Sequence, residues 1–204
     1  MLVMKKAILL HGKPGSGKSS CISVALERAS LSAYDSRHHF SVGNHLRSVA
    51  AGETPSLFAR EVRKGTEQLG NHEPIAHEVV NAVVAEYLGT LSARSLVVID
   101  GYPKYIEQIQ PFEENVQLAG ATILSIMHVI VPDEVAINRI VSRGVRAGET
   151  GLDLEFAQRR LSEHQTGARV TTEALAATYP IDVIDGTQPM NSVIWTMRQI
   201  LESS

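Results

Sequence analysis

The chain has 204 residues, of which 44% are hydrophobic, and a formal net charge of −3 at pH 7. This length suffices for one domain with its own core, and the weak negative charge argues against nucleic-acid binding, which needs a basic surface. The single cysteine, Cys21, excludes a disulfide framework and fits a reducing, cytoplasmic compartment. The first apolar run ends at Gly12, too early for a signal peptide, so we expect a cytoplasmic protein. No apolar run is long enough to span a membrane, and we expect no membrane binding. We also expect a monomer.

Alternating strands and helices are predicted along the chain. The strand patterns are short aliphatic runs bounded by Gly, Pro or Asp. They cover residues 6–11, 38–42 (the weakest), 95–100, 123–131 and 181–184. Helix patterns cover residues 17–29, 56–64, 74–88, 105–118, 132–143, 154–177 and 192–201. Apolar strands separated by helices predict an α/β fold of three layers, in which helices cover both faces of a parallel sheet.

Residues 12–19, GKPGSGKS, match the phosphate-binding pattern G-x-x-x-x-G-K-[ST] between the first predicted strand and helix. Glycines let successive N–H groups converge on one anion, and the following helix dipole adds to the field. We expect Lys18 to reach the β- and γ-phosphates of ATP, and the Ser19 hydroxyl to bind Mg²⁺. The alternative is a Gly-rich turn with an exposed lysine. The predicted ATP-binding residues of this segment are Gly12, Pro14, Gly15, Ser16, Gly17, Lys18, Ser19 and Ser20.

The strand predicted at residues 95–100 ends in a carboxylate, Asp100. An Asp in this place is commonly only a cap, but ligands of parallel sheets collect beyond the carboxyl ends of the strands. Beside a phosphate-binding loop, we therefore predict that Asp100 faces the same Mg²⁺ ion as Ser19. The Asn-Lys-x-Asp and Asp-x-x-Gly patterns of regulatory GTPases are absent from the sequence, which excludes that class.

Five segments together resemble the motifs of the adenylate kinase group of nucleoside monophosphate kinases, in the same order and at similar spacing. They are GKPGSGKSS, SVGNHLR (41–47), DGYPKYIEQ (100–108), PDEVAINRIVSRG (132–144) and RRLSEHQ (159–165). The resemblance covers about residues 5–201. It implies transfer of a phosphoryl group from Mg·ATP to a nucleoside monophosphate, and a P-loop fold with five parallel strands. It also implies a helical acceptor-binding insertion at about 41–73 and a short lid at about 143–153.

The resemblance assigns roles to several side chains. Arg47 would hold the acceptor phosphate, Arg143 and Arg160 would contact the transferred group, and Arg139 would stack on the donor adenine. Gln108 matches the position that faces the acceptor base, where an amide can pair twice with adenine, which favours AMP. The other acceptor-binding residues implied are Val42, Gly43, Gly101 and Lys104.

Some positions depart from the pattern of the family. Val42-Gly43-Asn44 stands where Thr-Gly-Asp is usual, and Lys104 replaces an arginine with a side chain that lacks the bidentate fork. In the lid, Glu149 falls where a catalytic arginine is expected, and Gly151-Leu152 replaces two aspartates. We hypothesise that Arg146, three residues before Glu149, is the substitute lid arginine. The departures leave open a second interpretation, a nucleotide-binding sensor or assembly partner with weak or no kinase activity.

Two histidine-containing segments are not predicted to be functional sites. HEPIAH (72–77) has a proline between its histidines and places the second five residues after the first, so both imidazoles cannot share one helix face. His38 and His39 are expected to be strand-end or core residues rather than a catalytic pair.

Overall fold

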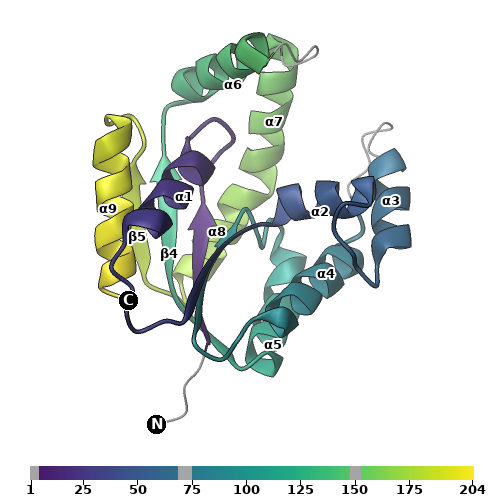
Figure 1. The fold of residues 1–204 in the computed structure, drawn as a ribbon. Coiled ribbons are helices and arrows are strands. Elements are labelled where there is room, and N and C mark those ends of the chain that lie inside the picture. Colours follow the sequence, from purple (N-terminus) through teal and green to yellow (C-terminus); the bar gives the residue numbers. More distant parts are fainter. Residues whose placement is uncertain (1–4, 69–74, 148–152) are drawn as a thin grey trace.

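The computed structural model describes residues 5–68, 75–147 and 153–204, and its strands form one five-stranded sheet (Figure 1). The strands are β1 (Lys5–His11), β2 (Ser36–Ser41), β3 (Ser95–Asp100), β4 (Ala121–Ile130) and β5 (Ile181–Asp185), in the spatial order β2-β3-β1-β4-β5. Every neighbouring pair is parallel. The carboxyl ends of the strands therefore meet at one edge of the sheet, as a ligand site in an α/β fold requires.

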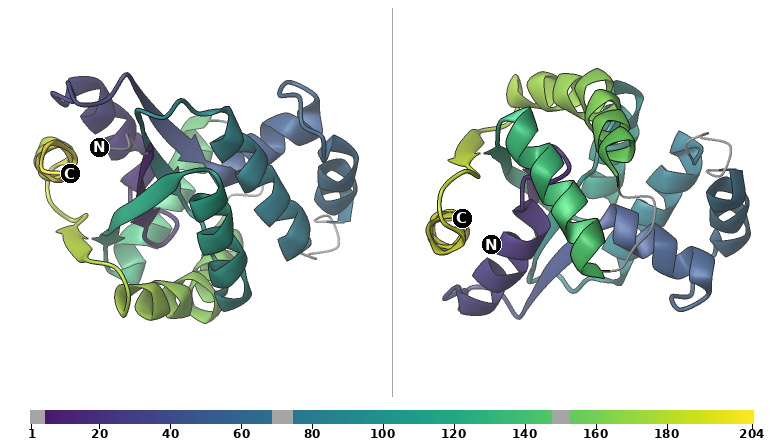
Figure 2. Two further views of the ribbon diagram at one scale, coloured as in Figure 1. Left: turned by 90° about the horizontal axis from the view of Figure 1, so that it is seen from below. Right: turned by 90° about the horizontal axis from the view of Figure 1, so that it is seen from above.

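Helices cover both faces of this sheet, which confirms the predicted three-layer α/β architecture. The helical elements are α1 (Lys18–Arg28), α2 (Val42–Ala51), α3 (Ala59–Gln68), α4 (His77–Thr90), η2 (Ile106–Gln108), α5 (Ile109–Leu118), α6 (Asp133–Ala147), α7 (Leu154–Thr166), α8 (Ala168–Ala176) and α9 (Met190–Glu202). Helices α1 and α9 pack on one face, and α4, α5 and α8 on the other (Figure 2). None of the described helices has the length and apolar character needed to cross a membrane.

The central strand β1 is apolar from Ala7 to Leu10 because helices cover both faces of the sheet at this strand. Ala7 and Leu9 belong to the core beneath α4 and α5, whereas Ile8 and Leu10 belong to the core beneath α1 and α9. All four side chains are fully buried. Because neighbouring side chains of a strand point to opposite faces, a strand between two helix layers has no solvent-facing positions.

Two pairs of helices stand beside the sheet. Helices α2 and α3 extend to the side of α4 and share its core through Val42, Leu46, Val49 and Val62 (Figure 1). Helices α6 and α7 pack on each other through a small separate cluster that includes Ile140 and Leu161. The insertion predicted at 41–73 begins with α2, and its last residues lie outside the described part of the chain. The lid predicted at 143–153 includes residues 148–152, which also lie outside it, so both segments stay predictions.

The secondary structure differs from the prediction in two places. The strand expected at 38–42 ends at Ser41, and the chain turns directly into α2, for which no helix was expected. The single helix expected at 154–177 is two helices that break at Gly167. A Cβ atom at Gly167 would lie 2.9 Å from the ring of Tyr105 and 3.2 Å from the Lys104 carbonyl oxygen. The break brings the backbone against this neighbouring loop, a contact that helical periodicity cannot reveal.

Candidate nucleotide-binding site

The loop between β1 and α1 is held in a shape that only glycine permits. Gly12 and Gly15 have φ values of 142° and 78°, and a Cβ atom at either position would lie 2.4 Å from a carbonyl oxygen, of Val129 and Ala136 respectively. Gly17 precedes α1 in the left-handed conformation, with φ of 85°. The backbone thus wraps tightly ahead of the helix, and no side chain caps the first N–H groups of α1.

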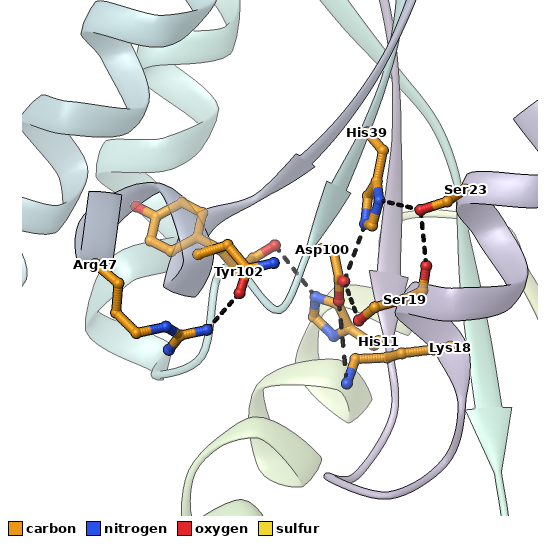
Figure 3. Close-up of polar contacts among 9 residues, drawn as sticks. His11, Lys18, Ser19, Ser23, His39, Arg47, Asp100 and Tyr102 are labelled. Atoms are coloured by element: carbon orange, nitrogen blue, oxygen red, sulfur yellow. Dashed lines mark hydrogen bonds and ion pairs between the residues drawn. The ribbon is translucent and has the colours of Figure 1, made fainter. Parts of the chain in front are cut away.

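Lys18, Ser19 and Asp100 come together at the carboxyl edge of the sheet, as the sequence predicts. The register of β1 and β3 pairs Leu10 with Asp100, which places the carboxylate beside the loop. The Ser19 hydroxyl donates to Asp100 Oδ2 at 2.5 Å, and Lys18 Nζ lies 4.0 Å from Oδ1 (Figure 3). The three side chains therefore form one contiguous polar group. His39 also contacts this group, through Asp100.

Asp100 is buried and Lys18 is half-buried, and each charge affects the other. Burial would raise the pKa of Asp100, which is 4% exposed, but the hydrogen bond from His39, the charge of Lys18 and the Ser19 hydroxyl together lower it. Burial lowers the pKa of Lys18, the charge of Asp100 opposes this, and the charge of Arg160 adds to the lowering. Asp100 is thus held as a carboxylate in an environment that would otherwise neutralise it.

These residues fit the Mg²⁺ ion that the sequence predicts. Magnesium binds oxygen ligands, and in nucleotide sites one or two protein groups suffice because phosphates and water complete the shell. Asp100 and Ser19 supply an ionised carboxylate and a hydroxyl 2.5 Å apart. In residues 5–68, 75–147 and 153–204 there is no cluster of three or more His, Cys, Asp or Glu side chains that could hold a metal without such a substrate.

His39 makes a contact with Asp100 that the sequence did not predict. Its Nε2 lies 3.1 Å from Asp100 Oδ2, and its Nδ1 lies 2.9 Å from the Ser23 hydroxyl. The neighbouring His38 instead contacts the Ser36 hydroxyl through its Nε2. Strand alternation separates the two imidazoles, but only the pairing of β2 with β3 determines that His39 faces Asp100. His39 is thus a strand-end residue, as expected, and it also contacts Asp100.

Arg143 and Arg160, on two other helices, lie within electrostatic range of Arg47. Burial lowers the pKa of Arg47 on α2, and the charges of Arg160 on α7 and Arg143 on α6 lower it further. Arg160 acts in the same sense on Lys18. Like charges at close range repel one another, and the repulsion is relieved when a polyanion binds among them. The arrangement is therefore suited to a ligand with several phosphate groups.

Other predicted residues have contacts that narrow their roles. Arg139 donates to the Ser16 carbonyl at 3.2 Å and to the Gly186 carbonyl at 3.0 Å, so any stacking on adenine would use the face of its guanidinium. Gln108 is 3% exposed, and its Oε1 accepts from the N–H groups of Lys104 and Tyr105 at 2.8 and 3.1 Å. Both lone pairs of this oxygen are then used, which leaves Nε2 as the atom to address a base.

The remaining predicted residues lie near this group. Lys104 is half-buried, with Nζ 5.3 Å from the centre of the Tyr105 ring. The N–H of Gly101 donates to the Leu10 carbonyl at 3.1 Å. Val42 and Gly43 begin α2, Ser20 is exposed in the first turn of α1, and Pro14 is half-buried in the loop. Arg146 belongs to α6. Glu149, Gly151 and Leu152 lie outside the described residues.

A buried histidine precedes the loop and should make the fold sensitive to acid. His11 is 3% exposed, with Nδ1 2.7 Å from Thr172 Oγ1 and Nε2 3.3 Å from the Tyr102 carbonyl. Burial lowers its pKa from 6.5 to about 4. Between these values only the unfolded chain binds the proton, so His11 alone should lower the free energy of unfolding by about 3 kcal/mol as the pH drops from 6.5 to 4.

Urea titrations at pH 7, 6, 5 and 4 would measure this loss. Burial also lowers the pKa of His164 to about 4, so His11→Asn should remove only part of the pH dependence. Asparagine can keep the hydrogen bond of Nδ1 while carrying no titratable group. Equal stability of the wild-type protein at pH 7 and pH 5 would contradict the prediction.

Comparison with known proteins gives a consistent relationship. No family model matches the chain. The chain is 25% identical over 202 residues to an adenylate kinase of Campylobacter curvus, covering 98% of this chain and 100% of that protein. It is 25% identical over 201 residues to an adenylate kinase of Nautilia profundicola, covering 98% and 97%. It is 23% identical over 201 residues to an adenylate kinase of Methylorubrum extorquens, covering 96% and 95%.

Proposed function

Because this chain is related to the adenylate kinases over nearly its whole length, we propose that it transfers the γ-phosphoryl group of Mg·ATP to AMP and releases two nucleoside diphosphates. Phosphotransfer between nucleotides is the activity at the level of the family, and AMP is the finer part of the proposal. A cytoplasmic location and a monomeric state, both expected from the sequence, belong to the same proposal.

One observation carries the proposal. Lys18 interacts electrostatically with Asp100, which is ionised, and with Arg160, and Arg160 and Arg143 interact in the same way with Arg47. The positive side chains come from four different helices, α1, α2, α6 and α7. Phosphoryl transfer proceeds through a loose transition state that needs alignment and surrounding cations rather than covalent catalysis. Cations on both the loop side and the arginine side suit a donor and an acceptor that meet between them.

The reaction then follows from the charges of this site. An oxygen of the acceptor phosphate, held by Arg47, attacks the γ-phosphorus, and the bond to the β–γ bridging oxygen breaks, so that ADP leaves. Arg143 and Arg160 would balance the charge on the oxygens of the transferred group, while Lys18 holds the β- and γ-phosphates. Magnesium, bound by Ser19 and Asp100 together with the phosphates, would neutralise further negative charge.

The acceptor side has two features that bear on AMP. Gln108 keeps Nε2 to donate to N1 of adenine, because its oxygen is used within the turn. The Arg47 guanidinium donates to the amide oxygen of Asn44. A neutral amide orients the guanidinium without cancelling its charge, which an aspartate in the same place would do. Asn44 therefore favours a strongly anionic acceptor group at Arg47.

The alternative is a nucleotide-binding sensor or assembly partner with weak or no kinase activity. Lys104 is the residue that favours it, because a lysine near an aromatic ring offers one point charge and no bidentate grip on a phosphate. A coupled assay with Mg·ATP and AMP, CMP, UMP, GMP or dAMP separates the two functions. The proposal expects ADP formation fastest with AMP. If the rate of ADP formation with every acceptor equals the rate of ATP hydrolysis without acceptor, the nucleotide-binding function is supported instead.

We propose that Arg146 supplies the positive charge of the lid, because Glu149, at the position where an arginine is expected, is acidic. Arg146→Ala should lower kcat by at least about tenfold, since a lost cation at the transition state costs one to several kcal/mol. Steady-state kinetics with Mg·ATP and the best acceptor measure this change. Glu149→Gln is the matched control and should leave kcat the same or higher. A loss smaller than tenfold for Arg146→Ala would refute the substitution hypothesis.

A further inference from the structure

A closed ring of hydrogen bonds begins and ends at Ser19 (Figure 3). The Ser19 hydroxyl donates to Asp100 Oδ2, and the same oxygen lies 3.1 Å from His39 Nε2. His39 Nδ1 lies 2.9 Å from Ser23 Oγ, and Ser23 Oγ lies 3.0 Å from the Ser19 carbonyl oxygen. The ring joins α1, β2 and β3, and it includes both side chains that fit Mg²⁺.

The direction of each hydrogen bond can be worked out from its atoms. Asp100 is held as a carboxylate and can only accept, so His39 must carry a proton on Nε2. When the imidazole is neutral, Nδ1 accepts, and the Ser23 hydroxyl can donate either to Nδ1 or to the Ser19 carbonyl oxygen. Ser23 has one hydrogen and two acceptors within reach, the other being the Ser19 carbonyl. Its hydroxyl therefore supports either the imidazole or the helix backbone at any moment, while the bond from His39 to Asp100 persists.

The two donors on Oδ2 determine which oxygen of Asp100 stays free. Ser19 and His39 both occupy Oδ2, and Lys18 Nζ lies 4.0 Å from Oδ1. Without His39, one donor on Oδ2 and a distant ammonium would leave the carboxylate free to rotate. Residues that hydrogen-bond to a metal-binding side chain commonly control how tightly the metal ion is bound.

We propose that His39 is a positioning residue, which holds Asp100 so that Oδ1 faces Lys18 and the Mg²⁺ that accompanies the nucleotide. Ser23 orients the imidazole from the other side. The inference rests on the proposed function, because it requires the metal-nucleotide site at Ser19 and Asp100. His39 contacts no substrate itself, and it acts through the carboxylate.

Two substitutions of His39 separate positioning from packing. The amide nitrogen of glutamine can take the place of Nε2. The asparagine side chain is shorter, so its amide nitrogen can take the place of Nδ1 only. His39→Asn should weaken Mn²⁺ binding in the presence of adenylyl-imidodiphosphate by about tenfold or more, and His39→Gln should retain binding within about threefold. Electron paramagnetic resonance of free Mn²⁺ measures both values without turnover.

Controls keep the test specific. His38→Gln changes the neighbouring imidazole, which contacts Ser36 rather than Asp100, and should leave Mn²⁺ binding unchanged. Ser23→Ala should weaken binding by only about threefold, and Ser23→Thr, which keeps the hydroxyl, should restore it. Melting temperatures with and without Mn²⁺ show whether each variant is folded. If His39→Asn is too unstable to assay, the comparison of His39→Gln with Ser23→Ala and Ser23→Thr still decides the question.

The outcomes separate this inference from the proposed function. Equal Mn²⁺ affinity in wild type, His39→Asn and Ser23→Ala would overturn the positioning role and leave the kinase assignment intact. Equal loss in His39→Asn and His39→Gln, together with equal falls in melting temperature, would also overturn it, because packing alone would then explain the effect. Failure of the wild-type protein to bind Mn²⁺ with adenylyl-imidodiphosphate would instead refute the metal-nucleotide site.

Discussion

Lys18→Met should reduce kcat for phosphoryl transfer by about 10³-fold, the loss typical of a charge that stabilises a transition state. Methionine keeps much of the length of the side chain but leaves Asp100 without the ammonium 4.0 Å from its Oδ1. The γ-phosphoryl group would also lose the cation nearest to the loop backbone. Single-turnover kinetics with Mg·ATP and AMP would measure the chemical step without product release.

The matched control for Lys18→Met is Lys13→Met in the same loop. Lys13 pairs with Asp133 at the surface, on the N-terminal side of the loop. Its removal should change kcat by less than about threefold, since an exposed ion pair contributes little. Comparable losses in the two variants would contradict the assignment of Lys18, because they would indicate damage to the loop as a whole.

The loop and its carboxylate could be predicted because their signals are local or follow a general rule. Glycine spacing encodes the turn directly, as the close approach of Gly12 and Gly15 to neighbouring carbonyl oxygens demonstrates. Asp100 follows from strand polarity, because every parallel strand delivers its last residue to the same edge of the sheet. Neither inference needed the pairing of particular strands or helices.

The features that the sequence did not predict have different physical causes. His39 faces Asp100 only because β2 pairs with β3, and the strand pattern at 38–42 carries no record of that partner. Helix α2 has an apolar face, but glycine and asparagine near its start weaken its local helical signal. The oxygen of Gln108 is bound within its own turn, whereas the sequence suggested that both amide atoms were available. Only the contact of His39 is tertiary, whereas the contacts of Gln108 are local to its turn.

Arg160→Ala should lower kcat by about 10²–10³-fold and leave the dissociation constant for Mg·ATP nearly unchanged. The charge of Arg160 lowers the pKa of both Lys18 and Arg47, the cations assigned to the donor and the acceptor. A cation in that place interacts most strongly with charge that develops during transfer. Equilibrium binding of Mg·adenylyl-imidodiphosphate alongside steady-state kinetics would separate the two effects.

Arg159→Ala tests whether the loss belongs to the site or to helix α7. Arg159 is adjacent in the sequence, but its guanidinium lies over the Phe156 ring, with 5.5 Å between the guanidinium carbon and the ring centre. Because neighbouring residues on a helix point about 100° apart, its removal perturbs the same helix without removing charge from the site. It should change kcat by less than about threefold. Similar losses in both variants would mean that α7 only braces the fold, and the transferred group would then need its cations from Arg47 and Arg143.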